Sequence, residues 1–243
     1  MRKLNEASFI TRIIRSKTWT FWLLLFLFYL PLGAAVVTSI AMLSYIHWPF
    51  RHFDIALPEQ ITASNLTIIT HGVHDDTNGW VSEFAAQISA TSDTDVIALD
   101  WSHYSRNPLT CSVNGERIGR LVANEFKDFK QIQNVTMVGH SCGAFVIYGF
   151  CDEFKALGKQ TDIHTIYLDP ISIYGGLQKN YGRDRFGTCE TTSVQYYDTD
   201  DNVIGSNAPF PHVKSVDVTD FKAQYGYSGN AHKWPIYYLL ETF

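Results

Sequence analysis

The chain is organised around the stretch Val135-Thr136-Met137-Val138-Gly139-His140-Ser141-Cys142-Gly143-Ala144. An apolar, β-branched run over residues 135–138 meets the pattern Gly-x-Ser-x-Gly, and a helix-compatible run over residues 144–154 follows. Between a strand and a helix, this pattern is typical of a nucleophile elbow, a tight turn that exposes the serine oxygen at the end of a sheet. Small residues on both sides of the serine let strand and helix approach closely. The alternative is a plain glycine turn. We take Ser141 as the candidate nucleophile.

Segments of strand character alternate with segments of helix character along the rest of the chain. The expected strands cover residues 65–70, 94–99, 135–138, 164–168, 193–197 and 213–218, and the expected helices cover residues 80–88, 114–130, 144–154 and 233–243. This alternation predicts a mostly parallel sheet covered by helices on both faces. Together with the elbow it predicts an α/β-hydrolase fold. Ligands of such sheets bind at the carboxyl ends of the strands.

The N-terminal part differs from the remainder. Residues 19–46 are free of charged side chains and, at about 1.5 Å per residue, can cross a hydrocarbon core of about 30 Å. Residues 1–17 carry five basic side chains and one acidic one, which predicts a cytoplasmic N-terminus. We therefore expect a cytoplasmic basic segment (1–18), a transmembrane signal anchor (19–46), kinked near Pro31, a linker (47–63) and an extracytoplasmic catalytic domain (64–243). A cleaved signal peptide is the alternative.

The charge and the cysteine content of the chain restrict which binding partners, metal sites and disulfides are expected. The residues after position 17 include 14 basic and 23 acidic side chains, and such an acidic domain argues against nucleic acid as a partner. The four cysteines form no Cys-x-x-Cys pair, which argues against a zinc site. In an extracytoplasmic domain we expect one disulfide, between Cys111 and Cys189, because both lie in loop-like sequence. Cys142 and Cys151 are expected to be buried thiols.

A serine nucleophile needs a base to take its proton and a third group to orient that base. In α/β-hydrolases the chain order is serine, acid, histidine. Three histidines follow Ser141: His164, His212 and His232. His164 begins a strand, at the opposite end of the sheet, and His212 directly precedes the last strand. His232 follows the last strand in a loop and is therefore the candidate base.

Two carboxylates are candidates for the acid. Asp169 follows the strand after the elbow, and Asp201 follows the next strand together with Asp198 and Asp200. A carboxylate can reach the histidine from either strand, so the spacing does not decide between them. A simple turn is the alternative for Asp169-Pro170.

The oxyanion of the reaction needs two N–H donors. One is expected to be the backbone amide of Cys142, directly after the nucleophile. The other is expected from the loop after the first strand, with the amide of Val73 as the best candidate.

A metal site is the alternative use of that same loop. It contains His71, His74, Asp75 and Asp76 in close succession. No further histidine or carboxylate partner is spaced to complete a metal site. We therefore expect a polar loop above the sheet, with neither a metal nor a cofactor.

With these residues in hand, the chain resembles the pancreatic-lipase-like family of serine lipases and phospholipases A1 over about residues 65–243. The matching segments are Thr67–Gly72 with Trp80, Val96–Ser102, Val138–Ala144, Leu168–Pro170, Tyr196–Val218, and Asn230–His232 with Tyr237 and Tyr238. The resemblance implies Asp169 rather than Asp201 as the acid, and a structural His212. The chain departs from the family at Cys142, where leucine is usual, and no cysteine pair brackets a lid before His232.

The sequence thus predicts a membrane-anchored serine carboxylester hydrolase of the lipase or esterase kind. Its substrate would be a lipid or a small ester, cleaved through an acyl-enzyme on Ser141. A thioesterase or peptidase on the same fold is one alternative, since a fold does not fix the substrate. A non-catalytic, membrane-tethered binding protein is another. The sequence indicates neither the acyl length nor the oligomeric state.

Overall fold

A computed structural model describes residues 16–48 and 52–243. The chain divides into two compact units, Met1–Pro49 and Phe50–Phe243. The predicted cytoplasmic segment therefore lies almost entirely outside the described residues.

The first unit contains one helix, Ser16–His47, that is long and apolar enough to cross a membrane, with a mean hydropathy of 2.2. A π-helical turn, η1 (Leu25–Tyr29), precedes α2 (Leu30–His47). The first N–H of α2 donates to the carbonyl of Leu25, five residues back. Pro31 lacks an N–H, and its ring would crowd the carbonyl four residues back in a regular helix. The interruption expected near Pro31 thus takes the form of a wider π turn.

The second unit is built on a six-stranded sheet in the order β2-β1-β3-β4-β5-β6. Its strands are β1 (Asn65–Thr70), β2 (Asp95–Leu99), β3 (Asn134–His140), β4 (Asp162–Leu168), β5 (Thr192–Tyr197) and β6 (Lys214–Asp217). Every neighbouring pair is parallel. The predicted parallel α/β sheet is confirmed, and together with the Gly-x-Ser-x-Gly turn after β3 it defines an α/β-hydrolase fold.

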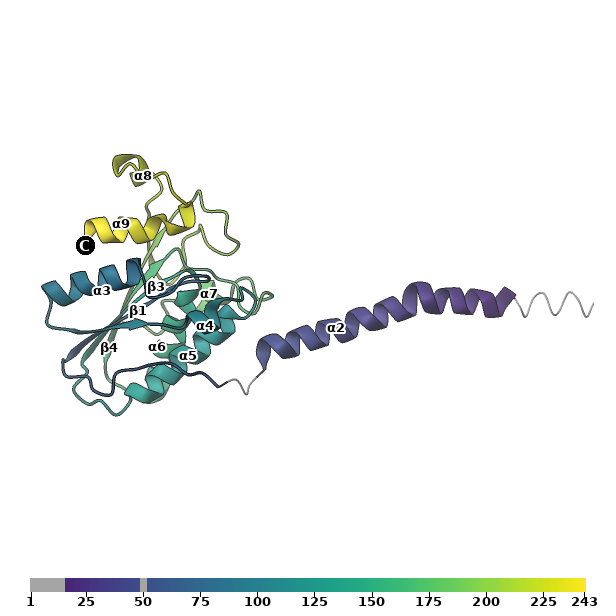
Figure 1. The fold of residues 1–243 in the computed structure, drawn as a ribbon, viewed down its shortest axis with the longest axis horizontal. Helices are drawn as coiled ribbons and strands as arrows, with labels where there is room; N and C mark the ends of the chain where they lie inside the picture. The colour runs from purple at the N-terminus through teal and green to yellow at the C-terminus, as the bar shows by residue number, and fades with distance from the viewer. Residues whose placement is uncertain (1–15, 49–51) are drawn as a thin grey trace, which may run out of the picture. The chain divides into compact units, whose positions relative to one another are not determined.

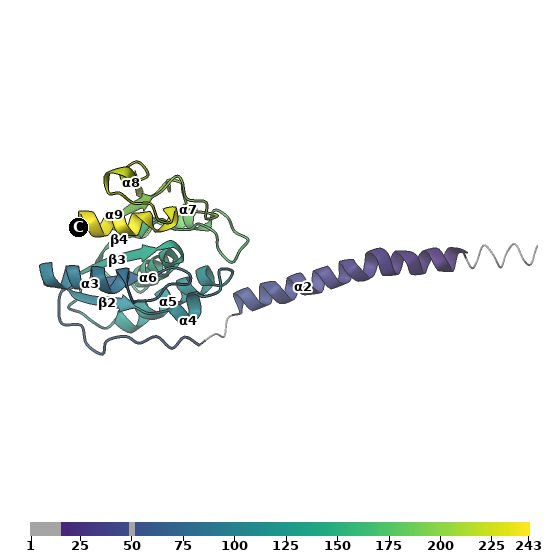
Figure 2. The same ribbon diagram turned by 45° about the horizontal axis from the view of Figure 1, so that its top comes forward.

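Helices cover both faces of this sheet (Figures 1 and 2). The helices described in this unit are α3 (Trp80–Thr91), α4 (Ser102–Ser105), α5 (Cys111–Phe126), α6 (Ala144–Ala156), α7 (Tyr181–Arg185), α8 (Phe221–Gln224) and α9 (Trp234–Thr242). Because strand side chains alternate between faces, Ile68 and Met137 belong to the core shared with α5 and α6. Ile69 and Val138 belong to the core shared with α3 and α9. Parallel strands buried on both sides explain the near-continuous apolar runs of the sequence.

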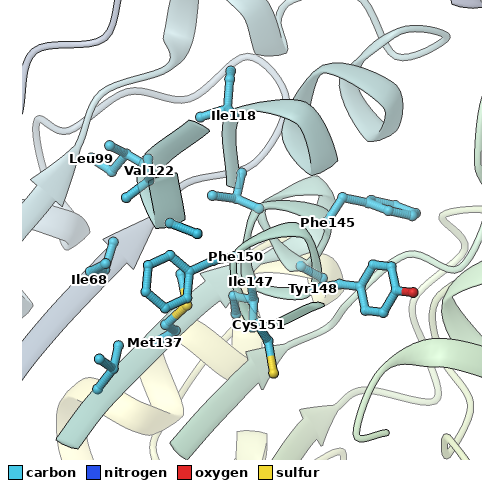
Figure 3. Close-up of a cluster of buried hydrophobic side chains, with 14 of the residues drawn as sticks. Ile68, Leu99, Ile118, Val122, Met137, Phe145, Ile147, Tyr148, Phe150 and Cys151 are labelled. Atoms are coloured by element: carbon cyan, nitrogen blue, oxygen red, sulfur yellow. The ribbon is translucent and has the colours of Figure 1, made fainter. Parts of the chain in front are cut away.

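The larger core lies between the sheet and the helices α5 and α6. Figure 3 shows strand residues Ile68, Leu99 and Met137 converging with helix residues such as Val122 and Phe150. These side chains are excluded from water almost completely. Burial of each such side chain contributes about 1.5–3 kcal/mol. This core also holds the turn at Ser141 in place, because α6 begins directly after that turn.

The described part of the predicted linker differs from the expectation. Residues 52–63 contain no regular helix or strand, yet Phe53 and Ile61 are buried in the larger core. The N–H of Asp54 donates to the Tyr104 hydroxyl at 2.7 Å. These apolar side chains lower the free energy by packing on the domain. Residues 52–63 therefore belong to the second unit.

Candidate active site

The strand, tight turn and helix predicted around Ser141 are present. β3 ends at His140, a single 3-10 turn (η2, Ser141–Gly143) follows, and α6 begins at Ala144. Ser141 has φ 54°, in the left-handed region that costs non-glycine residues about 1–3 kcal/mol. Such strain persists only where the surrounding structure enforces it, and it concentrates at functional sites.

The glycines of the motif are required by close approach. A Cβ at Gly139 would lie 2.8 Å from Cδ1 of Ile147 in α6. A Cβ at Gly143 would lie 2.3 Å from Oγ1 of Thr70, whose hydroxyl donates to the Gly143 carbonyl at 3.1 Å. The elbow is thereby clamped between its own helix and the end of β1.

The loop after β1 lies against Ser141, the predicted nucleophile, at the position predicted for an oxyanion loop. A Cβ at Gly72 would come within 2.9 Å of the Ser141 Cβ. Among the described residues, the backbone N–H of Val73 donates none of the hydrogen bonds found outside helices and strands.

His71 joins this loop to the loop after β2. Its Nε2 accepts from the N–H of Trp101 at 3.3 Å, and the Trp101 indole N–H donates to the His71 carbonyl at 3.0 Å. Asp75 accepts from the indole of Trp80 at 3.1 Å. Within residues 16–48 and 52–243, His71, His74, Asp75 and Asp76 do not converge as a metal-binding group.

His232, the predicted base, lies in the 3-10 turn η3 (Ala231–Lys233), which begins after Asn230. The Asn230 side chain accepts from the His232 N–H at 2.8 Å and fixes the start of the turn. The imidazole Nδ1 lies 3.1 Å from Oδ2 of Asp169 and 2.8 Å from Oδ2 of Asp201. The structure thus brings both candidate acids to the same ring nitrogen.

The other carboxylates after β5 are held elsewhere. Lys222 bonds Asp198 at 2.8 Å and Asp200 at 2.7 Å. The other two histidines that follow Ser141 make contacts of their own: His164 is within β4 and its Nδ1 contacts the Thr192 hydroxyl, and the carbonyl of His212 accepts from Ser193.

Sequence reasoning did not assign a role to His140, the variable residue before Ser141. Its Nε2–H donates to the backbone carbonyl of His232 at 2.9 Å, and the two ring centroids are 4.7 Å apart. Burial lowers the pKa of His140 to about 3, assisted by the charge of His232. His140 is therefore neutral, and its hydrogen bond holds the backbone of His232, the predicted base.

The two carboxylates determine the direction in which the pKa of His232 is shifted. Burial alone would lower the pKa of His232, but hydrogen bonds to Asp169 and Asp201 outweigh it and raise the pKa to about 9. Burial raises the pKa of Asp169 to about 6 despite its contact with His232. For Asp201, burial is outweighed by hydrogen bonds from His232 and Ser206, which lower its pKa.

No hydrogen bond joins the Ser141 hydroxyl to His232 in the described part of the chain. Catalytic hydrogen bonds of unliganded enzymes are often long and tighten when substrate binds. The Ser141 side chain is only slightly exposed.

The disulfide prediction was wrong. The bonded pairs are Cys111–Cys142 and Cys151–Cys189, so Cys142 and Cys151 are not thiols. Helix α5 begins at Cys111, three residues earlier than expected, and its first turn lies next to the elbow. The Cα atoms of Cys111 and Cys142 are 6.2 Å apart, within the range that a disulfide requires. A spacing along the chain does not reveal this proximity.

Removing the Cys111–Cys142 bond is expected to weaken both stability and activity. In Cys111→Ala/Cys142→Ala, loss of the cross-link should lower the free energy of unfolding by about 3 kcal/mol. Because Cys142 carries a predicted oxyanion donor, kcat/KM should also fall by about 10- to 100-fold. Urea unfolding and ester hydrolysis would measure the two effects.

The matched control is Cys151→Ala/Cys189→Ala, since that bond closes a loop of similar length, 38 residues against 31. It should lose similar stability and retain kcat/KM. Equal loss of activity in both variants would show that the Cys111–Cys142 bond has no specific effect on the elbow.

Asp169, Asp201 and His232 also place one oxygen or nitrogen atom each within 4.8 Å of one another. The hydrogen bonds of both carboxylates to the His232 Nδ1 account for this proximity. A second such group contains Cys151, Cys189 and Glu190, but its cysteines form a disulfide.

Comparisons with known proteins identify no family for this chain. No protein-family model matches the sequence, and no curated protein matches it significantly. Among solved structures, an esterase from Pyrococcus furiosus is 12% identical, with a TM-score of 0.46, over 67% of this chain and 79% of that one. Mouse alpha/beta hydrolase domain-containing protein 10 is 11% identical, with a TM-score of 0.46, over 79% and 96%.

A thioesterase from the prodiginine pathway of Streptomyces coelicolor is 12% identical, with a TM-score of 0.41, over 82% of this chain and 93% of that one. These likenesses are distant. The assignment of the fold therefore rests on the strand order and the elbow, and the resemblance to pancreatic-lipase-like enzymes stays a prediction.

Proposed function

We propose that this chain is a serine hydrolase that cleaves carboxylic esters, with Ser141 as nucleophile, His232 as base, and Asp169 together with Asp201 as the acids that orient the base. One observation carries the proposal: the strained Ser141 directly follows His140, whose ring contacts His232, and the Nδ1 of His232 is held by buried carboxylates. A hydroxyl becomes a useful nucleophile only beside such an oriented base.

The proposed reaction proceeds through an acyl-enzyme. Ser141 attacks the ester carbonyl while His232 takes the serine proton through Nε2, and His232 then gives that proton to the leaving alcohol. The N–H groups of Val73 and Cys142 stabilise the oxyanion. Water, activated by His232, then hydrolyses the acyl-enzyme, which releases the carboxylic acid product and restores Ser141. These steps use side chains and backbone amides of the chain itself.

Exposed apolar side chains support a lipid or acyl substrate. Leu109 lies beyond β2, Leu177 beyond β4 and Ile204 beyond β5, and all three are exposed, Ile204 by 77%. These loops follow the carboxyl ends of parallel strands, where ligands of such sheets bind. A substrate with an acyl chain would remove this apolar surface from water.

We further propose that the helix Ser16–His47 anchors the protein in a membrane, with the N-terminus cytoplasmic and the catalytic domain outside. The basic residues before the helix support this orientation. The two disulfides support it as well, because disulfides persist in oxidising compartments.

The test uses the full chain in detergent micelles with two substrates, p-nitrophenyl acetate and p-nitrophenyl decanoate. We expect hydrolysis of both, with the higher kcat/KM for the longer ester. A fluorophosphonate should modify the protein once, on Ser141, as mass spectrometry of the peptides would show. Folded protein that neither hydrolyses the esters nor reacts with the phosphonate would contradict the proposal and favour the binding protein.

A thioester substrate distinguishes an esterase from a thioesterase in the same assay. Hydrolysis of decanoyl-coenzyme A at a higher kcat/KM than the decanoate ester would identify a thioesterase. The same serine and histidine would then act on a different leaving group.

A further inference from the structure

Two carboxylates, rather than one, contact the Nδ1 of His232. A neutral imidazole Nδ1 carries one hydrogen, whereas two acceptor oxygens lie within 3.1 Å of it. Asp169 reaches it from the loop after β4 and Asp201 from the loop after β5. Both carboxylates are almost completely buried. Two buried like charges this close disfavour each other's ionised form unless a cation or proton lies between them.

The surroundings of the two carboxylates differ. Asp201 accepts hydrogen bonds from the Ser206 hydroxyl and from the backbone N–H of Val203, the latter at 3.1 Å. The Asn207 side chain also donates to the Asp201 carbonyl at 2.7 Å, which fixes the turn. An ionised carboxylate is stabilised by such donors. Asp201 is therefore the better site for the negative charge.

Asp169 has the opposite character. Its Oδ1 is buried and has no hydrogen-bond partner among the described residues. Its backbone has φ 43°, in the left-handed region, so the fold enforces this position at a cost. A buried oxygen without a donor is a poor place for charge and a suitable place for a proton. The raised pKa of Asp169 agrees with this geometry.

We propose that Asp169 and Asp201 hold His232 jointly. Asp201 is the ionised positioning carboxylate. Asp169 is the second carboxylate, and it carries the proton when the pair of carboxylates binds one. Each would then sustain part of the function when the other is replaced. The kinetic consequences rest on the proposed function, whereas the protonation of His232 does not.

The other titratable groups at His232 do not compete for this role. The His140 ring is neutral. Its Nε2–H donates to the backbone carbonyl of His232, and the two imidazole rings are in contact. Lys233, the next residue in η3, is a cation and cannot accept the Nδ1–H. The carboxylates are therefore the acceptors that raise the proton affinity of His232.

The experiment titrates His232 by NMR in the full chain, with ¹⁵N-labelled histidine, in detergent and with EDTA present to keep metal ions from the site. His232→Gln assigns the signal. We expect a pKa near 9 in the wild type. Asp169→Asn and Asp201→Asn should each move it part of the way toward the ordinary value of 6.5, and the double variant should move it furthest. A single variant that leaves the pKa unchanged would overturn joint holding.

Asp200→Asn is the matched control, because it removes a charge one residue from Asp201 while contacting Lys222 and not His232. It should leave the pKa of His232 unchanged. If an asparagine variant does not fold, the wild type still decides: the carboxyl ¹³C shifts of Asp169 and Asp201 should both move when His232 titrates. Movement of only one would contradict the proposal.

Ester hydrolysis provides a second measurement. Each single variant should lose at most about 100-fold in kcat/KM at pH 7, and the double variant about 10⁴-fold. The base must be neutral to act, so the wild-type rate should rise with pH toward 9, and each single variant should reach its plateau at lower pH. One single variant as slow as the double would overturn the proposal. Absence of hydrolysis by the wild type would reject the proposed function and leave the NMR result standing.

Discussion

Ser141→Ala is expected to lower kcat/KM for p-nitrophenyl esters by about 10⁴- to 10⁶-fold, the loss that follows removal of a nucleophile from a catalytic triad. The substitution deletes the oxygen that forms the acyl-enzyme and leaves the neighbouring N–H donors in place. The measurement is a steady-state comparison with the wild type in detergent. Since host esterases can contaminate such assays, fluorophosphonate labelling should disappear in parallel.

His232→Ala should produce a loss of similar size, because serine and base act as one unit. The double variant Ser141→Ala/His232→Ala should be no slower than the slower of the two single variants. Additive losses would mean that the two residues act independently, which would contradict the proposed mechanism.

Ser141→Gly separates catalysis from stability at the same position. It removes the nucleophile and also relieves the strain of φ 54°, because glycine adopts the left-handed region freely. Its free energy of unfolding should therefore exceed that of Ser141→Ala by about 1 kcal/mol. Equal stability of the two variants would show that the elbow stores no strain at Ser141.

Gly149→Ala is expected to lower the free energy of unfolding by about 4 kcal/mol, although this change in a helix interior normally adds about 1 kcal/mol of stability. Helices α5 and α6 touch at Gly149 and Gly119. A Cβ at Gly149 would lie 2.0 Å from the Glu116 carbonyl oxygen, and one at Gly119 would lie 2.1 Å from the Val146 carbonyl oxygen. The obstacles are backbone atoms, so the helices must separate to admit a methyl group.

Urea unfolding monitored by tryptophan fluorescence would measure this effect. Ala156→Gly, at the exposed last residue of the same helix, is the control and should cost less than about 1 kcal/mol. A Gly149→Ala protein as stable as the wild type would show that α5 and α6 are not in backbone contact. Because the elbow continues into α6, we also expect weaker phosphonate labelling of this variant.

The sequence by itself determined the features that depend on neighbours along the chain. The alternation of apolar runs predicted the parallel sheet, and the Gly-x-Ser-x-Gly pattern after an apolar run predicted the turn at Ser141. The position of His232 after the last strand predicted that it would reach a carboxylate. The uncharged run near the N-terminus predicted the long apolar helix. In each case local sterics and burial act over a few residues.

Only the tertiary structure decided the features that depend on which loops meet. Asp169, in the loop after β4, and Asp201, in the loop after β5, both contact His232. The spacing along the chain therefore could not show which of them is the acid. The early start of α5 placed Cys111 beside the elbow and reversed the disulfide prediction. Parallel strands bring their carboxyl ends to one edge of the sheet, and this juxtaposition of distant segments has no signature along the chain.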